Sequence, residues 1–126
     1  MAYEIPDFKV AFTAGEDLSS AQFKFLTMES DGQVDLADAE TDIAIGVLQN
    51  KPTAGQAAQV MISGITKVEA DETLAAGNLV HPSADGQAAV FAAGTDTTKY
   101  CAGIVLEGAA AGQLATVLLG NYGRGA

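Results

Sequence analysis

The side chains best suited to chemistry in this 126-residue chain are its carboxylates. Sixteen residues are Asp or Glu, and the densest group lies in the segment 35–42. Two converging carboxylates can hydrolyse a glycosidic bond, and carboxylate oxygens can bind calcium. The segment 35–42 lacks the Asp-x-Asp-x-Asp-Gly order of a calcium loop, and its mixture of acids with Ala and Thr is typical of a solvated loop. It therefore predicts neither a metal site nor a hydrolase.

The other reactive residue types occur singly. His81 is the only histidine, which excludes a histidine-based metal cluster, and its place before Pro82 predicts an exposed position at a strand end. Cys101 has no partner for an intrachain disulfide, and the apolar run around it predicts a buried, inert thiol. Neither Gly-x-Ser-x-Gly nor a Gly-x-x-x-x-Gly-Lys phosphate loop occurs. We therefore expect no catalytic residues, no metal, no cofactor and no enzymatic activity.

The formal net charge of −10 limits the classes of partner. Nucleic-acid binding needs a basic surface, and an anionic membrane would repel this chain, so neither is an expected partner. The charge is compatible with two roles, solubility and complementarity to a basic protein surface. The N-terminal residues carry no signal-peptide pattern, and no apolar run approaches the ~20 residues of a membrane helix. We expect synthesis in a host cytoplasm.

The elements that must position these residues are short strands. Fourteen glycines and repeated Asp-Gly and Ala-Gly steps divide the chain into short apolar or alternating runs. This pattern predicts an all-β fold, a small β-barrel or β-sandwich, with single helical turns at 16–21 and 71–76. Asp31-Gly32 and Asp85-Gly86 predict tight type I′ turns. The expected strands cover residues 8–12, 23–28, 43–48, 60–62, 65–68, 79–81, 88–91, 103–106 and 115–119.

An internal repeat is visible in the order of these runs. Gly46-Val47-Leu48 precedes Ala54-Gly55-Gln56, and the same order recurs with Gly103-Ile104-Val105 and Ala111-Gly112-Gln113 at a constant spacing. Chance matches among abundant Ala and Gly are the alternative. We predict one domain over residues 8–119, with repeated halves at about 14–62 and 70–119. Residues 1–7 are expected to form an N-terminal arm, and 120–126 a flexible tail.

The ordered motifs, taken together, resemble the capsid cement, or head decoration, proteins of tailed phages. The likeness covers about residues 8–119 and depends on patterns of small and apolar residues. It is carried by Ala14-Gly15-Glu16-Asp17-Leu18, Asp42–Leu48, Ala54-Gly55-Gln56, Val60–Gly64, Leu74–Val80, Gly86-Gln87-Ala88, Gly103–Leu106 and Gly112–Val117.

This resemblance implies a structural protein of the virion. Cement proteins bind the outer surface of the major capsid protein lattice, commonly as homotrimers, and stabilise the head. Their N-terminal arms often reach the lattice, which makes Tyr3, Ile5, Phe8 and Val10 the candidate capsid-binding residues. An ordinary first strand is the equal alternative for Phe8 and Val10. A carbohydrate- or receptor-binding β module on a virion or cell surface is the alternative function.

Overall fold

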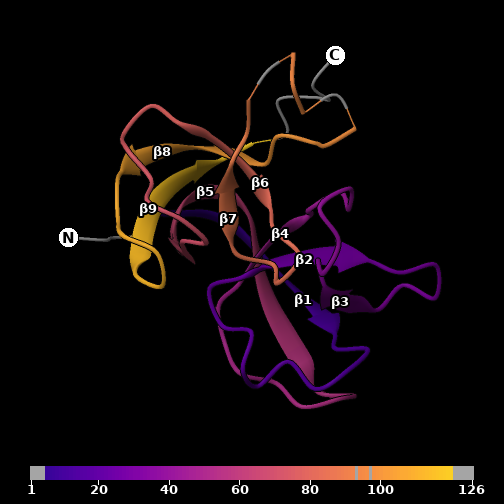
Figure 1. Cartoon of the computed structure of the whole chain (residues 1–126). Coiled ribbons are helices and arrows are strands. Elements are labelled where there is room, and N and C mark those ends of the chain that lie inside the picture. The colour runs from indigo at the N-terminus through magenta and orange to yellow at the C-terminus, as the bar shows by residue number, and fades with distance from the viewer. Residues whose placement is uncertain (1–4, 93, 97, 121–126) are drawn as a thin grey trace.

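One antiparallel sheet organises the molecule (Figure 1). The computed structural model describes residues 5–92, 94–96 and 98–120, with the side chains of 5–7 left out. Its nine strands are β1 (Ile5–Thr13), β2 (Phe25–Met28), β3 (Val34–Leu36), β4 (Gly46–Leu48), β5 (Ala57–Glu69), β6 (Leu79–Pro82), β7 (Ala88–Val90), β8 (Gly103–Glu107) and β9 (Leu114–Leu119). The predicted all-β class is confirmed.

The two predicted helical turns are wrong. Residues 16–21 and 71–76 form turns, bends and an isolated bridge, and the described residues contain no helix, so none that could cross a membrane. In the first segment the N–H of Leu18 donates to the carbonyl of Pro52, which ties the loop to a neighbouring one instead of to itself. Because a single helical turn fixes three residues for one hydrogen bond, a contact with another loop easily replaces it.

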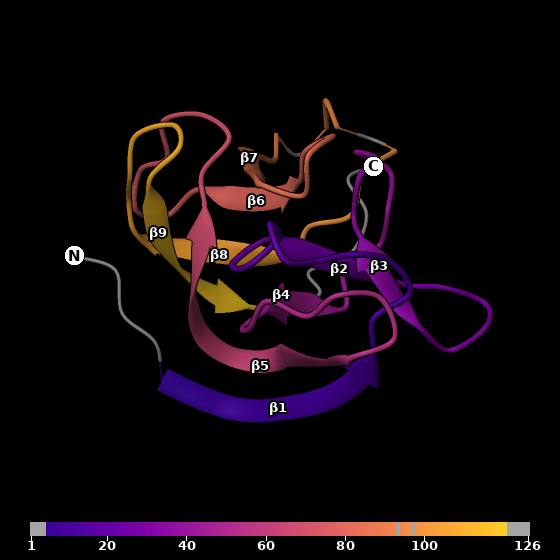
Figure 2. The same ribbon diagram turned by 90° about the horizontal axis from the view of Figure 1, so that it is seen from below.

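The long strand β5 holds the sheet together. One of its edges pairs with β1, and its other edge pairs first with β4 and then with β9. Figure 2 shows β1 and β5 side by side as a curved pair, so that the sheet curls into a half-barrel. The sequence predicts a break at Ser63-Gly64, but β5 runs through it, because Gly64 pairs with Pro6 on one side and Leu119 on the other.

The two halves of the chain repeat the same strand pattern. β2 pairs with β3 and β4, and β4 pairs with β5; correspondingly β6 pairs with β7 and β8, and β8 pairs with β9. A side-chain contact recurs as well, since Glu16 accepts a hydrogen bond from the N–H of Leu36 (2.9 Å) and Glu72 accepts one from Val90 (3.0 Å). The paired strands of each half therefore have matching positions in the other half.

The two Asp-Gly hairpins have a different turn from the predicted one. A type I′ turn needs positive φ at both central residues, whereas only Gly32 (+83°) and Gly86 (+74°) have it, and both Asp residues do not. In the first hairpin Glu29 pairs with Gln33, and the N–H of Gly32 donates to the carbonyl of Glu29. The loop therefore has three residues, 30–32, and its last residue is a glycine in the left-handed backbone conformation.

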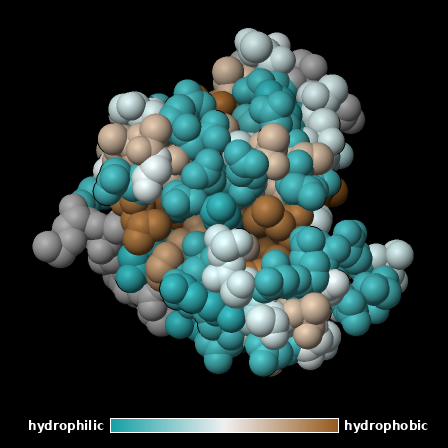
Figure 3. Space-filling model, turned by 60° about the horizontal axis from the view of Figure 1, so that its bottom comes forward, coloured by the Kyte–Doolittle hydropathy of each residue, from teal (hydrophilic) through white to brown (hydrophobic). Residues whose placement is uncertain are grey.

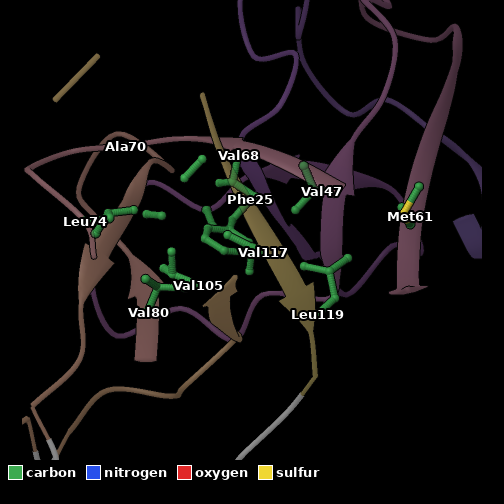
Figure 4. Close-up of a cluster of buried hydrophobic side chains, with 13 residues drawn as sticks. Phe25, Val47, Met61, Val68, Ala70, Leu74, Val80, Val105, Val117 and Leu119 are labelled. Carbon is green, nitrogen blue, oxygen red and sulfur yellow. The ribbon is translucent and has the colours of Figure 1, made fainter. Parts of the chain in front are cut away.

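The core lies on the inner face of the curled sheet. Figure 4 shows side chains from both halves meeting there, with Phe25 of β2 beside Val117 of β9 and Val68 of β5. A second cluster belongs to the first half and includes Leu18, Leu26, Val34, Leu48 and Val60. Burial of such side chains contributes roughly 1.5–3 kcal/mol each relative to exposure, which makes the two clusters the main source of stability.

Candidate functional site

The four predicted capsid-binding residues lie on or before β1. Tyr3 is outside the described residues, and Ile5 begins β1, so the strand starts inside the predicted arm 1–7. Phe8 is 57% exposed and is the most exposed large apolar side chain of the described residues. Val10 is half-buried and lies opposite Val60 of β5. The structure therefore brings Phe8 and Val10 onto one strand, but only Phe8 offers its side chain to a partner.

β1 is an edge strand of the sheet. Its pairing runs along β5 from Ile65 to Ala57, and the register shifts on both sides of Phe8. Pro6 lies near the start of the strand, which is a position that suits proline because an edge strand can lose an N–H donor. An edge strand presents unpaired N–H and C=O groups to other chains, and register shifts are one way in which proteins limit that pairing.

His81 is buried, which corrects the predicted exposed position. It is only 2% exposed on β6, its Nδ1 lies 2.7 Å from the carbonyl oxygen of Pro82, and its ring meets the edge of Phe91. The neighbours of His81 in the sequence do not predict this burial, because the ring that contacts it belongs to Phe91, ten residues later. Cys101 is also buried, which confirms the predicted burial of its thiol, and desolvation raises the pKa of that thiol above its ordinary value.

Four carboxylates gather around the β2–β3 hairpin. A hydrogen bond with Asp35, burial, and the nearby charges of Asp35, Asp31 and Asp42 raise the pKa of Glu29 above its ordinary value. One carboxylate oxygen of Asp35 is enclosed without a hydrogen-bond partner. In residues 5–92, 94–96 and 98–120, no group of His, Cys, Asp or Glu has an arrangement suited to a metal ion. The cluster is therefore a patch of mutually repelling charge.

Beside these carboxylates lies a shallow apolar groove, which we call the Met28–Ile43 groove. Its volume is about 420 Å³, and it is lined by Thr27, Met28, Thr41, Asp42, Ile43 and Ile45. Ile43 is 49% exposed and Met28 is 38% exposed. Figure 3 shows, on one face, that apolar surface is confined to small areas within a largely hydrophilic exterior. Sequence reasoning missed this groove, although Met28 ends one apolar run and Ile43 begins the next, each beside an acidic residue.

A smaller hollow of about 80 Å³ lies between the two halves. Phe25, Ile45 and Ile62 line it from the first half, and Ala102 and Leu119 line it from the second. It is too small for an organic ligand, since ligand pockets usually enclose about 300–1,000 Å³. The described surface thus offers an exposed edge strand and a shallow groove.

Comparison with known proteins gives a fold neighbour but no family. No family model and no curated protein matches this chain. A solved structure that is similar is the N base of head fiber gp8.5 in bacteriophage phi29, with a TM-score of 0.68 and 23% sequence identity. The match covers 90% of this chain and 95% of that one. At this identity the likeness shows a shared fold.

Proposed function

We propose that this chain is a non-enzymatic structural protein of a bacteriophage head, which binds the outer surface of the major capsid protein lattice and stabilises the head. One observation carries the proposal: almost the whole chain shares its fold with the base of a phage head fibre. The motifs that resemble cement proteins lead independently to the same class of particle. Because fold alone does not define function, the exposed surface must also fit this role.

The N-terminal strand is the proposed attachment element. Phe8 is 57% exposed on β1, and aromatic anchors of this kind contribute much of the binding energy at protein interfaces. The outer edge of β1 can add hydrogen bonds from its backbone to an extended segment of the partner. Tyr3, Ile5 and Val10 are proposed to extend this contact along the lattice.

Charge and multiplicity support a position outside the shell. A net charge of −10 would be repelled by packaged DNA, so the outer surface is the favourable side. A protein that binds the assembled lattice and not free subunits stabilises the lattice by mass action. We propose a homotrimer, because three linked copies bind a repeating surface much more tightly than one copy does.

Sedimentation with purified heads tests the proposal. Heads that carry the cognate major capsid protein and lack this chain are mixed with wild-type protein, with Phe8→Ser, or with Leu114→Ser. Leu114 is a matched control, since it is 38% exposed on β9 at a distance in the sequence from β1. We expect wild-type protein and Leu114→Ser to pellet with heads and to raise the temperature at which heads rupture. Phe8→Ser should bind at least about tenfold more weakly, which corresponds to a loss of about 1.4 kcal/mol of binding free energy.

Three outcomes would contradict parts of the proposal. Absence of wild-type protein from the pellet, with saturable binding to a glycan instead, would favour the carbohydrate- or receptor-binding alternative. Equal binding by Phe8→Ser would remove β1 as the attachment element. A monomeric mass both in solution and on imaged heads would remove the homotrimer.

A further inference from the structure

The Met28–Ile43 groove is open in the first half of the chain, whereas the matching place in the second half is closed. The register of the hairpins pairs Thr27 with Asp35 and, correspondingly, His81 with Ala89. Met28 therefore corresponds to Pro82 in the second half. Met28 is 38% exposed, whereas Pro82 is buried and His81 is only 2% exposed.

A difference in loop length accompanies this contrast. In both halves the loop starts at a residue whose N–H donates to the first residue of the hairpin's first strand: Ala37 to Phe25, and Phe91 to Leu79. It ends at a residue whose N–H donates to the next residue of that strand: Ile45 to Leu26, and Ala102 to Val80. The second loop is three residues longer between those equivalent points, counted from the same bonds. It also contains Asp96, which lies near buried His81 and accepts a hydrogen bond from the N–H of Ala92. The loop of the first half lacks these three residues.

The acidic rim is also confined to the first half. Glu29, Asp35 and Asp42 belong to it, and the matching residues of the second half are Ser83, Ala89 and Lys99. Among the acids of the two hairpins, only Asp31 and Asp85 occupy matching positions. A hydrogen bond with Asp35, burial, and then repulsion by Asp35, Asp31 and Asp42 raise the pKa of Glu29, so these carboxylates lie close enough to interact. Such repulsion is relieved when a cation approaches.

We propose that the Met28–Ile43 groove docks an apolar side chain that a partner protein presents between lysine or arginine residues. The groove supplies the apolar contact through Met28, Ile43 and Ile45, and the carboxylates beside it supply the charge complementarity. A second copy of this chain is the weaker candidate, because two chains of net charge −10 repel each other. The inference deepens the proposed function: the partner is the head surface, and the groove is a second contact beside β1.

Nuclear magnetic resonance with synthetic peptides tests the groove without any phage head. The first probe is a peptide with one leucine between lysine and arginine residues; the second has glutamates in place of the basic residues, and the third has glycine in place of leucine. We expect only the first peptide to shift the amide signals of residues 27–28 and 41–45 in a saturable manner. Added salt should weaken that binding.

Matched variants locate the site. Ile43→Ser and Glu29→Gln should each weaken binding of the first peptide, by about tenfold for Ile43→Ser. Leu114→Ser and Asp71→Asn remove an exposed apolar and an exposed acidic residue of the second half, and they should leave binding unchanged. Equal binding of all three peptides, shifts elsewhere on the protein, or no shifts at millimolar peptide would overturn the inference. Concentration-dependent shifts at residues 41–45 without peptide would assign the groove to a second copy and also overturn it.

Sedimentation with heads separates this inference from the proposed function. If wild-type protein pellets with heads and Ile43→Ser pellets equally well, the groove proposal fails while the proposed function stands. If wild-type protein does not pellet but the peptide results hold, the proposed function fails and the groove remains a site for a basic, apolar segment of another protein.

Discussion

A glycine in each half is expected to stabilise the fold for steric reasons. Gly46 on β4 and Gly103 on β8 occupy matching positions against the neighbouring strand. A Cβ at position 46 would collide with the carbonyl oxygen of Met61 and lie 2.8 Å from Cγ1 of Val60. At position 103 it would lie 2.8 Å from the carbonyl oxygen of Leu118. Backbone atoms cannot move aside cheaply, so Gly46→Ala and Gly103→Ala should both destabilise the fold.

Two opposing effects set the size of the loss. Alanine loses less conformational entropy than glycine on folding, which favours the variant by roughly 0.5–1 kcal/mol. Overpacking a dense interior costs about 1–3 kcal/mol, and a clash with backbone lies toward the upper end. The net expectation is a loss of about 1–2 kcal/mol for each variant. For a chain of this size, roughly 3–5 °C per kcal/mol gives a fall in Tm of about 3–10 °C.

Urea unfolding followed by circular dichroism measures this loss, and Gly112 provides the contrast. Gly112 has φ of +82° and open space where a Cβ would lie, so Gly112→Ala is strained by conformation and not by contact. Gly112→Asn should be milder than Gly112→Ala because asparagine tolerates this conformation. At position 46 asparagine should be at least as harmful as alanine. An unchanged unfolding midpoint for Gly46→Ala would refute the steric reasoning.

Three further predictions concern stability and pH. Phe25→Ala empties a fully buried site and should cost about 3–5 kcal/mol in urea unfolding, whereas Phe8→Ala, at a 57% exposed site, should stay within about 0.5 kcal/mol of wild type. Asp96→Ala removes the acceptor of the Ala92 N–H; since the pKa of Asp96 is lowered in the fold, wild type should lose its advantage over this variant as pH falls through that pKa. Glu29→Gln should raise Tm at alkaline pH, and the gain should vanish in acid, because the pKa of Glu29 is raised in the fold. An equal effect of either charge variant at all pH values would contradict these assignments.

Much of the fold could be predicted because its information is local. Alternating apolar residues define most strands, and the Ala-Gly-Gln steps before β5 and β9 are turns, with Gly55 at φ +85° and Gly112 at +82°. The spacing of Gly46 and Gly103 indicated two similar units, and the structure gives both the same contact with the adjacent strand. These features depend on residues that are neighbours in the sequence or that meet across one pair of strands, so a single sequence can predict them.

The missed features depend on contacts between distant segments. β3 lies in the acidic stretch that the sequence presents as a loop, and it forms because Val34 and Leu36 pair with β2. Phe23 was expected to begin a strand, but it has φ of +64° in a turn, and the Nζ of Lys67 lies 5.0 Å from the centre of its ring. The candidate attachment residues remain predictions, because the contact that would identify them involves a second molecule.

The repeat explains how one small sheet can combine stability with adhesion. β1 pairs with the first part of β5 along one edge, and β9 pairs with the second part along the other edge, so one long strand both holds β1 and joins the two halves. Two copies of a unit can then differ in their loops without changing their strands. The longer loop of the second half accompanies a buried His81, while the shorter loop of the first half leaves Met28 and Ile43 exposed beside carboxylates. On the proposed function, the second half serves mainly to hold the fold, and the first half provides both contacts with the partner, Phe8 on β1 and the Met28–Ile43 groove.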